Sequence, residues 1–126
     1  MKLAAFLGLS GALGVLFGLE FLLIPEMALA QYGVPTEAHN LMQARYFGSM
    51  LLAFGLLQWL ARGTLDTTAR RALLLAAVVG NLLGLLLSLQ ARFTGLQNAL
   101  AWLPVAIYGA LLLGTLAFLL RPSLRD

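Results

Sequence analysis

Long apolar segments alternate with short polar ones along almost the whole chain. Four segments, at residues 3–24, 43–61, 72–90 and 99–120, are almost continuously apolar. A helix needs about 20 such residues to cross the hydrocarbon core of a bilayer, and each segment is close to that length. The pattern therefore predicts an all-α, polytopic membrane protein, in which residues 1–126 form a single domain of four antiparallel transmembrane helices.

Composition supports a membrane protein and excludes several kinds of chemistry. Hydrophobic residues make up 61% of the chain and charged residues 10%, whereas soluble domains have about 45–50% and about 25%. The chain has no cysteine, so it can form no disulfide, thiolate metal site or iron–sulfur cluster. Its single histidine, His39, cannot build a haem pair or a histidine cluster. We therefore expect no metal and no cofactor.

The basic residues indicate how the chain is oriented. Alternate assignment of the helix ends to two sides places Arg45 and Arg92 on one side. The other side receives Lys2, Arg62, Arg70, Arg71, Arg121 and Arg125. The positive-inside rule then predicts that both termini are cytoplasmic. Because the membrane explains these residues, the net charge of +3 gives no reason to expect a nucleic-acid partner.

Three of the four segments carry their polar residues on one helical face. In the third expected helix, the helical spacing places Asn81, Gly84, Ser88 and Arg92 within one narrow arc. The corresponding faces hold Arg45, Gly48, Ser49, Leu52 and Gly55 in the second expected helix, and Gln97, Ala101, Pro104, Tyr108 and Thr115 in the fourth. Unpaired polar groups are costly in hydrocarbon, so these faces are expected to point into the bundle or a wet cavity.

The first segment differs because its two special faces are nearly opposite. Gly11, Gly14 and Gly18 lie on one side, and Glu20 lies on the other. Glycines permit close helix packing in lipid, whereas a carboxylate needs a partner. One solution turns Glu20 into the bundle and offers the glycine face to a second copy, which predicts a homo-oligomer. The alternative buries both faces within one irregular four-helix bundle.

Three charged residues are expected at similar depth near the outer surface. Glu20 and Arg45 are predicted to form an ion pair, because burying either charge alone is costly, and Arg92 ends the third helix on the same side. The pair could simply pin two helices together. Alternatively, the surplus positive charge could hold a carboxylate, a phosphate headgroup or a small polar solute. The residues flanking that site would be Asn81, Ser88 and Tyr108.

Local signals predict two helix starts and one kink. Asp66 or Thr67 is expected to cap the third long helix. Thr36 is expected to cap the second, with Glu37 near the positive end of its dipole. Pro104 is expected to kink the fourth helix.

Segments in the first half resemble a known group of proteins. They read Gly-Leu-Glu-Phe-Leu-Leu-Ile-Pro at 18–25, Tyr-Gly-Val-Pro at 32–35 and Ala-Arg-Tyr-Phe-Gly at 44–48. In these the chain resembles small bacterial four-helix membrane proteins of the DoxX-like group. The resemblance implies a multi-pass protein of the bacterial inner membrane. Some members of that group are associated with quinone-linked redox complexes, but this chain has few residues that could support a redox centre of its own.

Catalytic motifs are missing from the sequence. It contains no Ser/His/Asp arrangement, HExxH, Walker or Rossmann loop, or paired intramembrane carboxylates. We therefore expect a non-enzymatic inner-membrane protein with an outward-facing polar pocket that binds or passes a small solute, an ion or a lipid-like molecule. The alternatives are an accessory subunit that packs against a larger membrane complex, and an enzyme acting on lipid or quinone.

Overall fold

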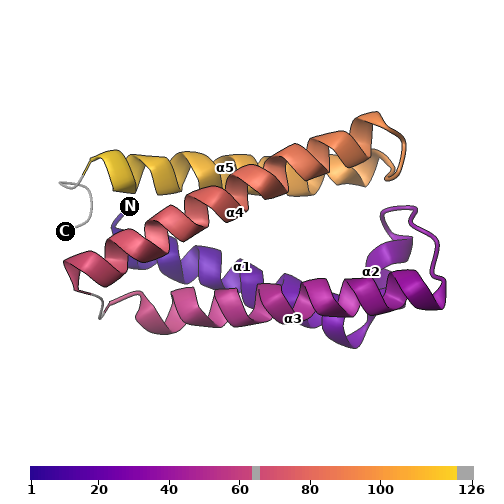
Figure 1. Cartoon of the computed structure of the whole chain (residues 1–126), viewed down its shortest axis with the longest axis horizontal. Coiled ribbons are helices and arrows are strands. Elements are labelled where there is room, and N and C mark those ends of the chain that lie inside the picture. Colours follow the sequence, from indigo (N-terminus) through magenta and orange to yellow (C-terminus); the bar gives the residue numbers. More distant parts are fainter. Residues whose placement is uncertain (64–65, 122–126) are drawn as a thin grey trace.

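The computed structural model describes residues 1–63 and 66–121, and every regular element in them is helical (Figure 1). The elements are α1 (Leu3–Leu23), the short α2 (Pro25–Ala30), α3 (Ala38–Ala61), α4 (Thr67–Phe93), the single 3-10 turn η1 (Ala99–Ala101) and α5 (Trp102–Leu120). The all-α prediction is thus confirmed. The apolar segments correspond to the four long helices, with α3 beginning five residues before its apolar segment.

Within residues 1–63 and 66–121, three helical segments are long and apolar enough to cross a membrane. They are Leu3–Leu23, Thr67–Phe93 and Ala99–Leu120. Helix α3 is not among them, because polar residues such as Arg45 and Gln58 interrupt its apolar surface. The structure is therefore compatible with a membrane protein.

The predicted helix ends are partly correct. Asp66 caps α4, with its carboxylate accepting a hydrogen bond of 2.7 Å from the backbone N–H of Ala69. The predicted Thr36 cap is wrong, because Glu37 occupies the cap position of α3 and its side chain makes no capping bond. Pro104 lies in the first turn of α5, where its missing N–H breaks no helical hydrogen bond. The backbone is irregular in η1, the 3-10 turn that immediately precedes α5.

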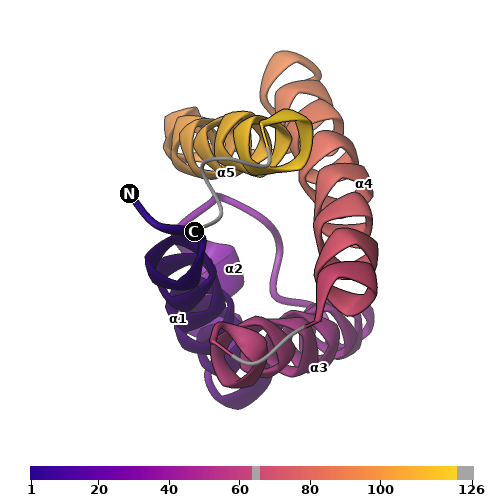
Figure 2. The same cartoon turned by 90° about the vertical axis from the view of Figure 1, so that its left-hand side faces the viewer.

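Helices α1 and α3 form one closely packed pair (Figures 1 and 2). At Gly18, an added Cβ would lie 2.6 Å from the backbone nitrogen of Leu52, and at Gly55 it would lie 2.6 Å from that of Val15. Only glycine fits where two backbones approach so closely. The glycine face of α1, comprising Gly11, Gly14 and Gly18, is therefore covered by α3 of the same chain. It is not open to a second copy, so any self-association would need another surface.

Helices α4 and α5 form the second pair, and the hydrophobic core joins it to the first at one end of the molecule. There the rings of Phe6 and Phe118 pack with centroids 5.2 Å apart, and Phe6 also occupies the space beside Gly114. Leu74 of α4 is fully buried in the same cluster. This core end holds the start of α1, the end of α5 and the connection between α3 and α4 (Figure 1).

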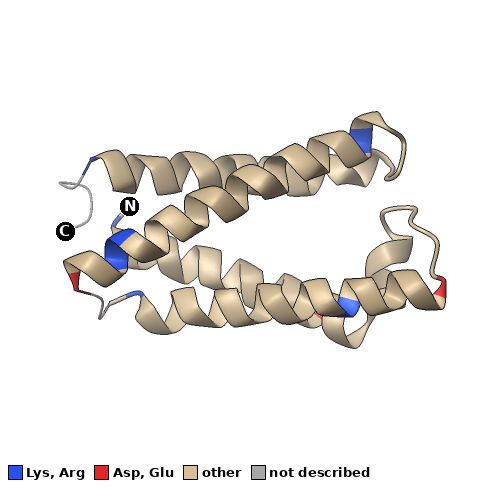
Figure 3. Cartoon of the chain, viewed as in Figure 1, with Lys and Arg blue, Asp and Glu red and all other residues tan. Residues whose placement is uncertain are grey.

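Charged residues gather at the two ends of the helices (Figure 3). Because successive long helices alternate in direction, the core end holds Lys2, Arg62, Arg70, Arg71 and Arg121. Arg45 and Arg92 lie toward the opposite end, and Arg125 falls outside the described residues. The predicted division of the basic residues between two ends therefore agrees with the arrangement of the helices.

Candidate ligand cleft

A cleft of about 580 Å³ lies between the α1–α3 pair and the α4–α5 pair. All four long helices line it, mostly with apolar and aromatic side chains. Its walls include Phe17 and Phe21 of α1 and Phe47 and Phe54 of α3, and Pro104 lies on the α5 side. Its volume lies within the range of about 300–1,000 Å³ that is usual for small-molecule sites.

Three polar side chains line the part of the cleft from the core end to the middle of the helices. Ser10, Gln58 and Asn81 come from α1, α3 and α4 respectively. The Nδ2 of Asn81 donates a long hydrogen bond of 3.4 Å to the hydroxyl of Thr115. That hydroxyl in turn donates to the carbonyl of Leu111, at 2.6 Å. Three helices thus each present one uncharged hydrogen-bonding group.

Gln58 is the most unusual member of this group. Its side chain is only 4% exposed, and its Oε1 is buried without a hydrogen-bond partner. Within the described part of the chain, the amide of Gln58 forms no hydrogen bond. Leaving a buried polar group unpaired costs about 1–3 kcal/mol, so this amide is poised for a partner from outside the chain.

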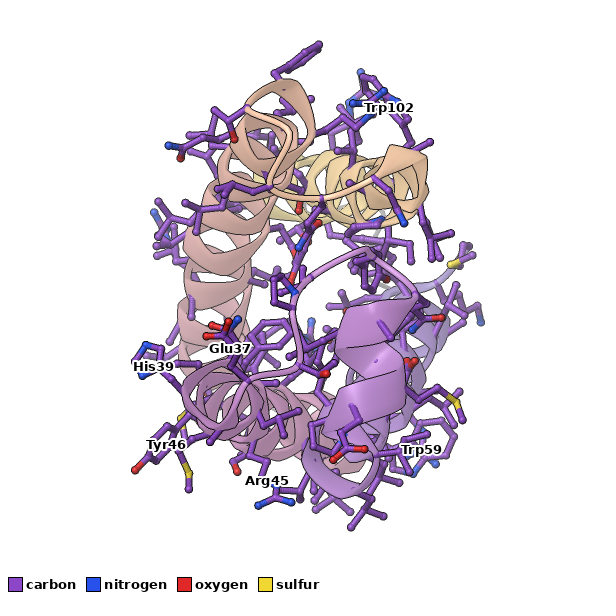
Figure 4. All side chains as sticks on the ribbon, turned by 90° about the vertical axis from the view of Figure 1, so that its right-hand side faces the viewer. Glu37, His39, Arg45, Tyr46, Trp59 and Trp102 are labelled. Atoms are coloured by element: carbon purple, nitrogen blue, oxygen red, sulfur yellow. The ribbon has the colours of Figure 1, made fainter. Side chains whose placement is uncertain are left out.

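The far end of the cleft is covered by a segment that we call the strap, residues 25–37. Its Tyr32 is 6% exposed, lines the cleft and stacks on Phe21 with centroids 6.4 Å apart. The backbone N–H of Asn98 donates to the carbonyl of Tyr32 at 2.9 Å, and its Nδ2 donates to that of Gln31 at 3.0 Å. The strap is thereby tied to the turn before α5, and Figure 4 shows it crossing this end of the molecule.

Burial also changes the chemistry of the strap tyrosine. Removal from water raises the pKa of the Tyr32 phenol above its ordinary value of 10.0. The negative charge of Glu20, and that of Tyr108 when ionised, raise this pKa further. Tyr32 is therefore a neutral phenol at physiological pH, and it closes the cleft without adding charge.

The cleft opens to the side, between α3 and α4. Helix α4 begins near the end of α3 and diverges from it along its length (Figures 1 and 2). The cleft residues Met50 of α3 and Leu87 of α4 are 69% and 63% exposed. In contrast, the cleft residues of α1 and α5 are buried or half-buried. The exposed edge of the cleft therefore belongs to α3 and α4.

The structure brings together only half of the predicted site residues. Asn81, Ser88 and Tyr108 all line the cleft, as a site at the interior face would require. Glu20 and Arg45 do not line it, and the ion pair predicted between them is not formed among the described residues. The three cleft residues therefore lie apart from the predicted charges.

Each partner of the predicted ion pair is placed elsewhere. The carboxylate of Glu20 accepts a hydrogen bond from the side-chain amide of Gln31 in the strap. Arg45 is exposed on the outer surface of α3 (Figure 4). The glycine contact explains this, because backbones that meet at Gly18 and Gly48 leave no room between them for a long side chain. Arg45 instead extends outward, as long basic side chains do near membrane surfaces.

Arg92 also turns away from the cleft. Its guanidinium lies 5.9 Å from the centroid of the Trp102 ring, at the start of α5. Its Nε is buried and has no hydrogen-bond partner in the residues described. Arg92 thus packs between α4 and α5 and supplies no positive charge to the cleft.

Ser10, Gln58 and Tyr32 are cleft residues that the sequence prediction missed. The spacing 10–14–17–21 in α1 and the spacing 47–51–54–58 in α3 each place one polar residue on a face rich in phenylalanine. That periodicity could have identified Ser10 and Gln58. Tyr32 had no such signal, because it lies in a turn that closes by long-range hydrogen bonds.

The fold and cleft together define a class: an all-helical chain, compatible with a membrane, that encloses an apolar cleft. Among the described residues, no group of three His, Cys, Asp or Glu side chains could hold a metal ion. The chain belongs to the family described as "Domain of unknown function (DUF8292)", which covers residues 9–124. No curated protein and no solved structure matches the chain. The family description names no activity.

Proposed function

We propose that the chain is a non-enzymatic inner-membrane protein that binds a lipid-like molecule in the cleft between its helix pairs. In this proposal, the four long helices form an antiparallel transmembrane bundle with both termini cytoplasmic. The observation that carries the proposal is the sideways opening of an apolar cleft between α3 and α4.

The packing of α3 supports its inclusion as a fourth transmembrane helix. It has 24 residues and lies against α1, which is itself apolar and long enough to cross a bilayer. When two helices pack side by side over this length, their ends lie at similar depths in a bilayer. The five basic residues at the core end would then face the cytoplasm.

The position of the opening supports a lipid-like ligand over a water-soluble one. The core end is filled by Phe6 and Phe118, and the strap covers the other end with Tyr32. In a membrane, the remaining side between α3 and α4 would face hydrocarbon. A molecule that enters there must already be dissolved in the bilayer.

The side chains that line the cleft also favour a lipid-like ligand. Among the described residues that line the cleft, none is Lys, Arg, Asp or Glu. An ion or a charged solute would therefore lose its water without gaining an opposite charge, which is costly in a medium of low dielectric constant. This favours a lipid-like molecule among the ligands considered from the sequence.

A blocking variant tests the proposal. An added Cβ at Gly80, which lines the cleft, would meet no atom within 4 Å, so Gly80→Phe should fill the cleft without disturbing the backbone. Val79→Phe adds the same ring to the neighbouring position, which is exposed and outside the cleft. Native mass spectrometry from mild detergent should show an apolar molecule retained by wild type and by Val79→Phe. We expect Gly80→Phe to lose most of it, whereas equal retention by both variants would contradict the proposal.

An accessory role is the second candidate function. The exposed side chains of Met50 and Leu87 leave an apolar groove that a helix of a larger complex could fill. In that case, Gly80→Phe should release a protein, whereas the lipid content should not change. The relationship to the DoxX-like group remains a prediction, because the family description does not bear on it.

A further inference from the structure

We infer that the cleft selects an uncharged lipid with a hydroxyl at its polar end, of the long-chain alcohol class, and that Gln58 binds this hydroxyl. The inference rests on the proposed function, since it names the ligand class of the same cleft. It is carried by the unpaired amide of Gln58, which lines the cleft and is more than nine-tenths buried.

The buried Oε1 of Gln58 is a hydrogen-bond acceptor that lacks a donor. The NH₂ group of the same amide carries two donors, and rotation about the last side-chain bond exchanges the positions of the two groups. A hydroxyl can pair with whichever of the two groups faces it, because it has one donor and two acceptor sites. A carbonyl has no donor, so it could never pair with the oxygen.

Two other polar groups that line the cleft are uncharged as well. Ser10 on α1 is 8% exposed and lines the cleft, and Asn81 on α4 lines it as well. These are a hydroxyl and an amide, with no formal charge. A carboxylate or phosphate at this place would be desolvated without a cation to balance it.

The depth of Gln58 suits a lipid of the inner leaflet. Gln58 lies about one turn before Ala61, the last residue of α3, and Arg62 follows directly. Under the proposed topology, this end faces the cytoplasm, so the hydroxyl would lie just below the inner membrane surface. The alkyl chain would run along the phenylalanine walls toward Tyr32, beside the opening between α3 and α4.

Three probes of equal chain length test the inference: 1-hexadecanol, hexadecane and hexadecanoate. Each is titrated by native mass spectrometry against the full chain in a nonionic detergent. The variant is Gln58→Leu, which keeps the side-chain size and removes both hydrogen-bonding groups. Gln90→Leu makes the same change at an exposed position of α4 outside the cleft and serves as the control.

For wild type and Gln90→Leu, we expect the alcohol to bind about fivefold or more tightly than the alkane, as one additional net hydrogen bond requires. We expect the carboxylate to bind more weakly than the alcohol. In Gln58→Leu the preference for alcohol over alkane should vanish, while alkane binding persists. The same variant should unfold at a higher temperature without ligand, since it no longer buries an unpaired amide. Ser10→Ala should reduce the preference in part, which supplies a second, independent variant.

Three results would overturn the inference while leaving the proposed function intact. One is equal binding of alcohol and alkane by wild type, and another is an unchanged preference in Gln58→Leu. Tighter binding of the carboxylate than of the alcohol would likewise show that the polar end is charged. If none of the three probes binds and Gly80→Phe changes nothing, the proposed function fails as well.

Discussion

Helix α3 faces α1 on one side and α4 on the other, and the two sides differ in how closely the helices approach. Toward α1, glycines bring the backbones together until no added Cβ would fit at Gly18 or Gly55. Toward α4, the helices diverge, and cleft residues such as Met50 remain largely exposed. Dispersion between close backbones stabilises helix pairs in lipid, where the hydrophobic effect contributes little. The α1 side therefore holds α3 in place, and the α4 side leaves the edge of the cleft exposed.

The largest expected loss of stability comes from adding a side chain where α1 and α3 are in closest contact. Gly18→Ala would place a Cβ 2.6 Å from the backbone nitrogen of Leu52, so the two helices must separate. We expect a loss of about 2–3 kcal/mol in the free energy of unfolding, measured by thermal or SDS-induced unfolding in detergent. Gly109→Ala on α5, where a Cβ would lie 4.0 Å from its nearest neighbour, serves as the control. Equal losses in both variants would contradict the glycine contact.

Releasing the strap should reduce the free energy of unfolding by a smaller amount. Asn98→Ala removes the hydrogen bond to the carbonyl of Gln31 and the cap on the backbone N–H of Leu100. We expect a cost of about 1–2 kcal/mol, together with faster amide hydrogen exchange at residues 31–37. Thr94→Ala, which removes only a local bond to the carbonyl of Gln90, should leave that exchange unchanged. Unchanged exchange in Asn98→Ala would mean that this residue does not hold the strap.

Alkaline pH should also destabilise the strap, because it ionises the Tyr32 phenol. The folded pKa of Tyr32 lies above the unfolded value of 10.0, because burial disfavours the phenolate. Its stability contribution is therefore fully present below pH 10.0 and is lost as the pH rises through the folded pKa. Unfolding temperatures measured across this range should fall less steeply for Tyr32→Phe than for wild type. Parallel curves would show that Tyr32 is not buried in the folded protein.

The smallest effect is expected on the open side of α3. Met50→Ala removes a side chain that is 69% exposed, so the folded state loses few contacts. We expect a change within about 0.5 kcal/mol in detergent unfolding, as for surface positions in general. A loss comparable to that of Gly18→Ala would show that α3 and α4 pack closely there, and it would remove the contrast between the two sides.

The apolar pattern predicted the long helices well, because a segment that is long and apolar enough to cross a bilayer is recognised from its own residues, whatever its neighbours are. It was also sufficient to divide the basic residues between two ends. Asn81, Ser88 and Tyr108 were found for the same reason, since polar residues at helical spacing turn inward.

The charged site was predicted less well, because a single helix pattern does not say which neighbour a face meets. Glu20 and Arg45 were paired by depth, yet the close contact of Gly18 with Gly48 leaves Arg45 outside. Two arginines were expected at the depth of Glu20, but the strap brings Gln31 to it instead. Such partners depend on how helices rotate and how loops fold back, which periodicity does not encode.

We propose that the cleft opens to lipid between α3 and α4, and not to water at the outer surface. The chain has no cysteine, so Ser88→Cys, at a half-buried cleft position, can carry a single nitroxide in lipid bilayers. Collision rates with oxygen and with a water-soluble nickel chelate then report its surroundings, with labels at Val79 and Gly63 as the lipid and water references. We predict high oxygen and low nickel accessibility at Ser88, as at Val79. High nickel accessibility would instead indicate a water-filled pocket and would contradict the account.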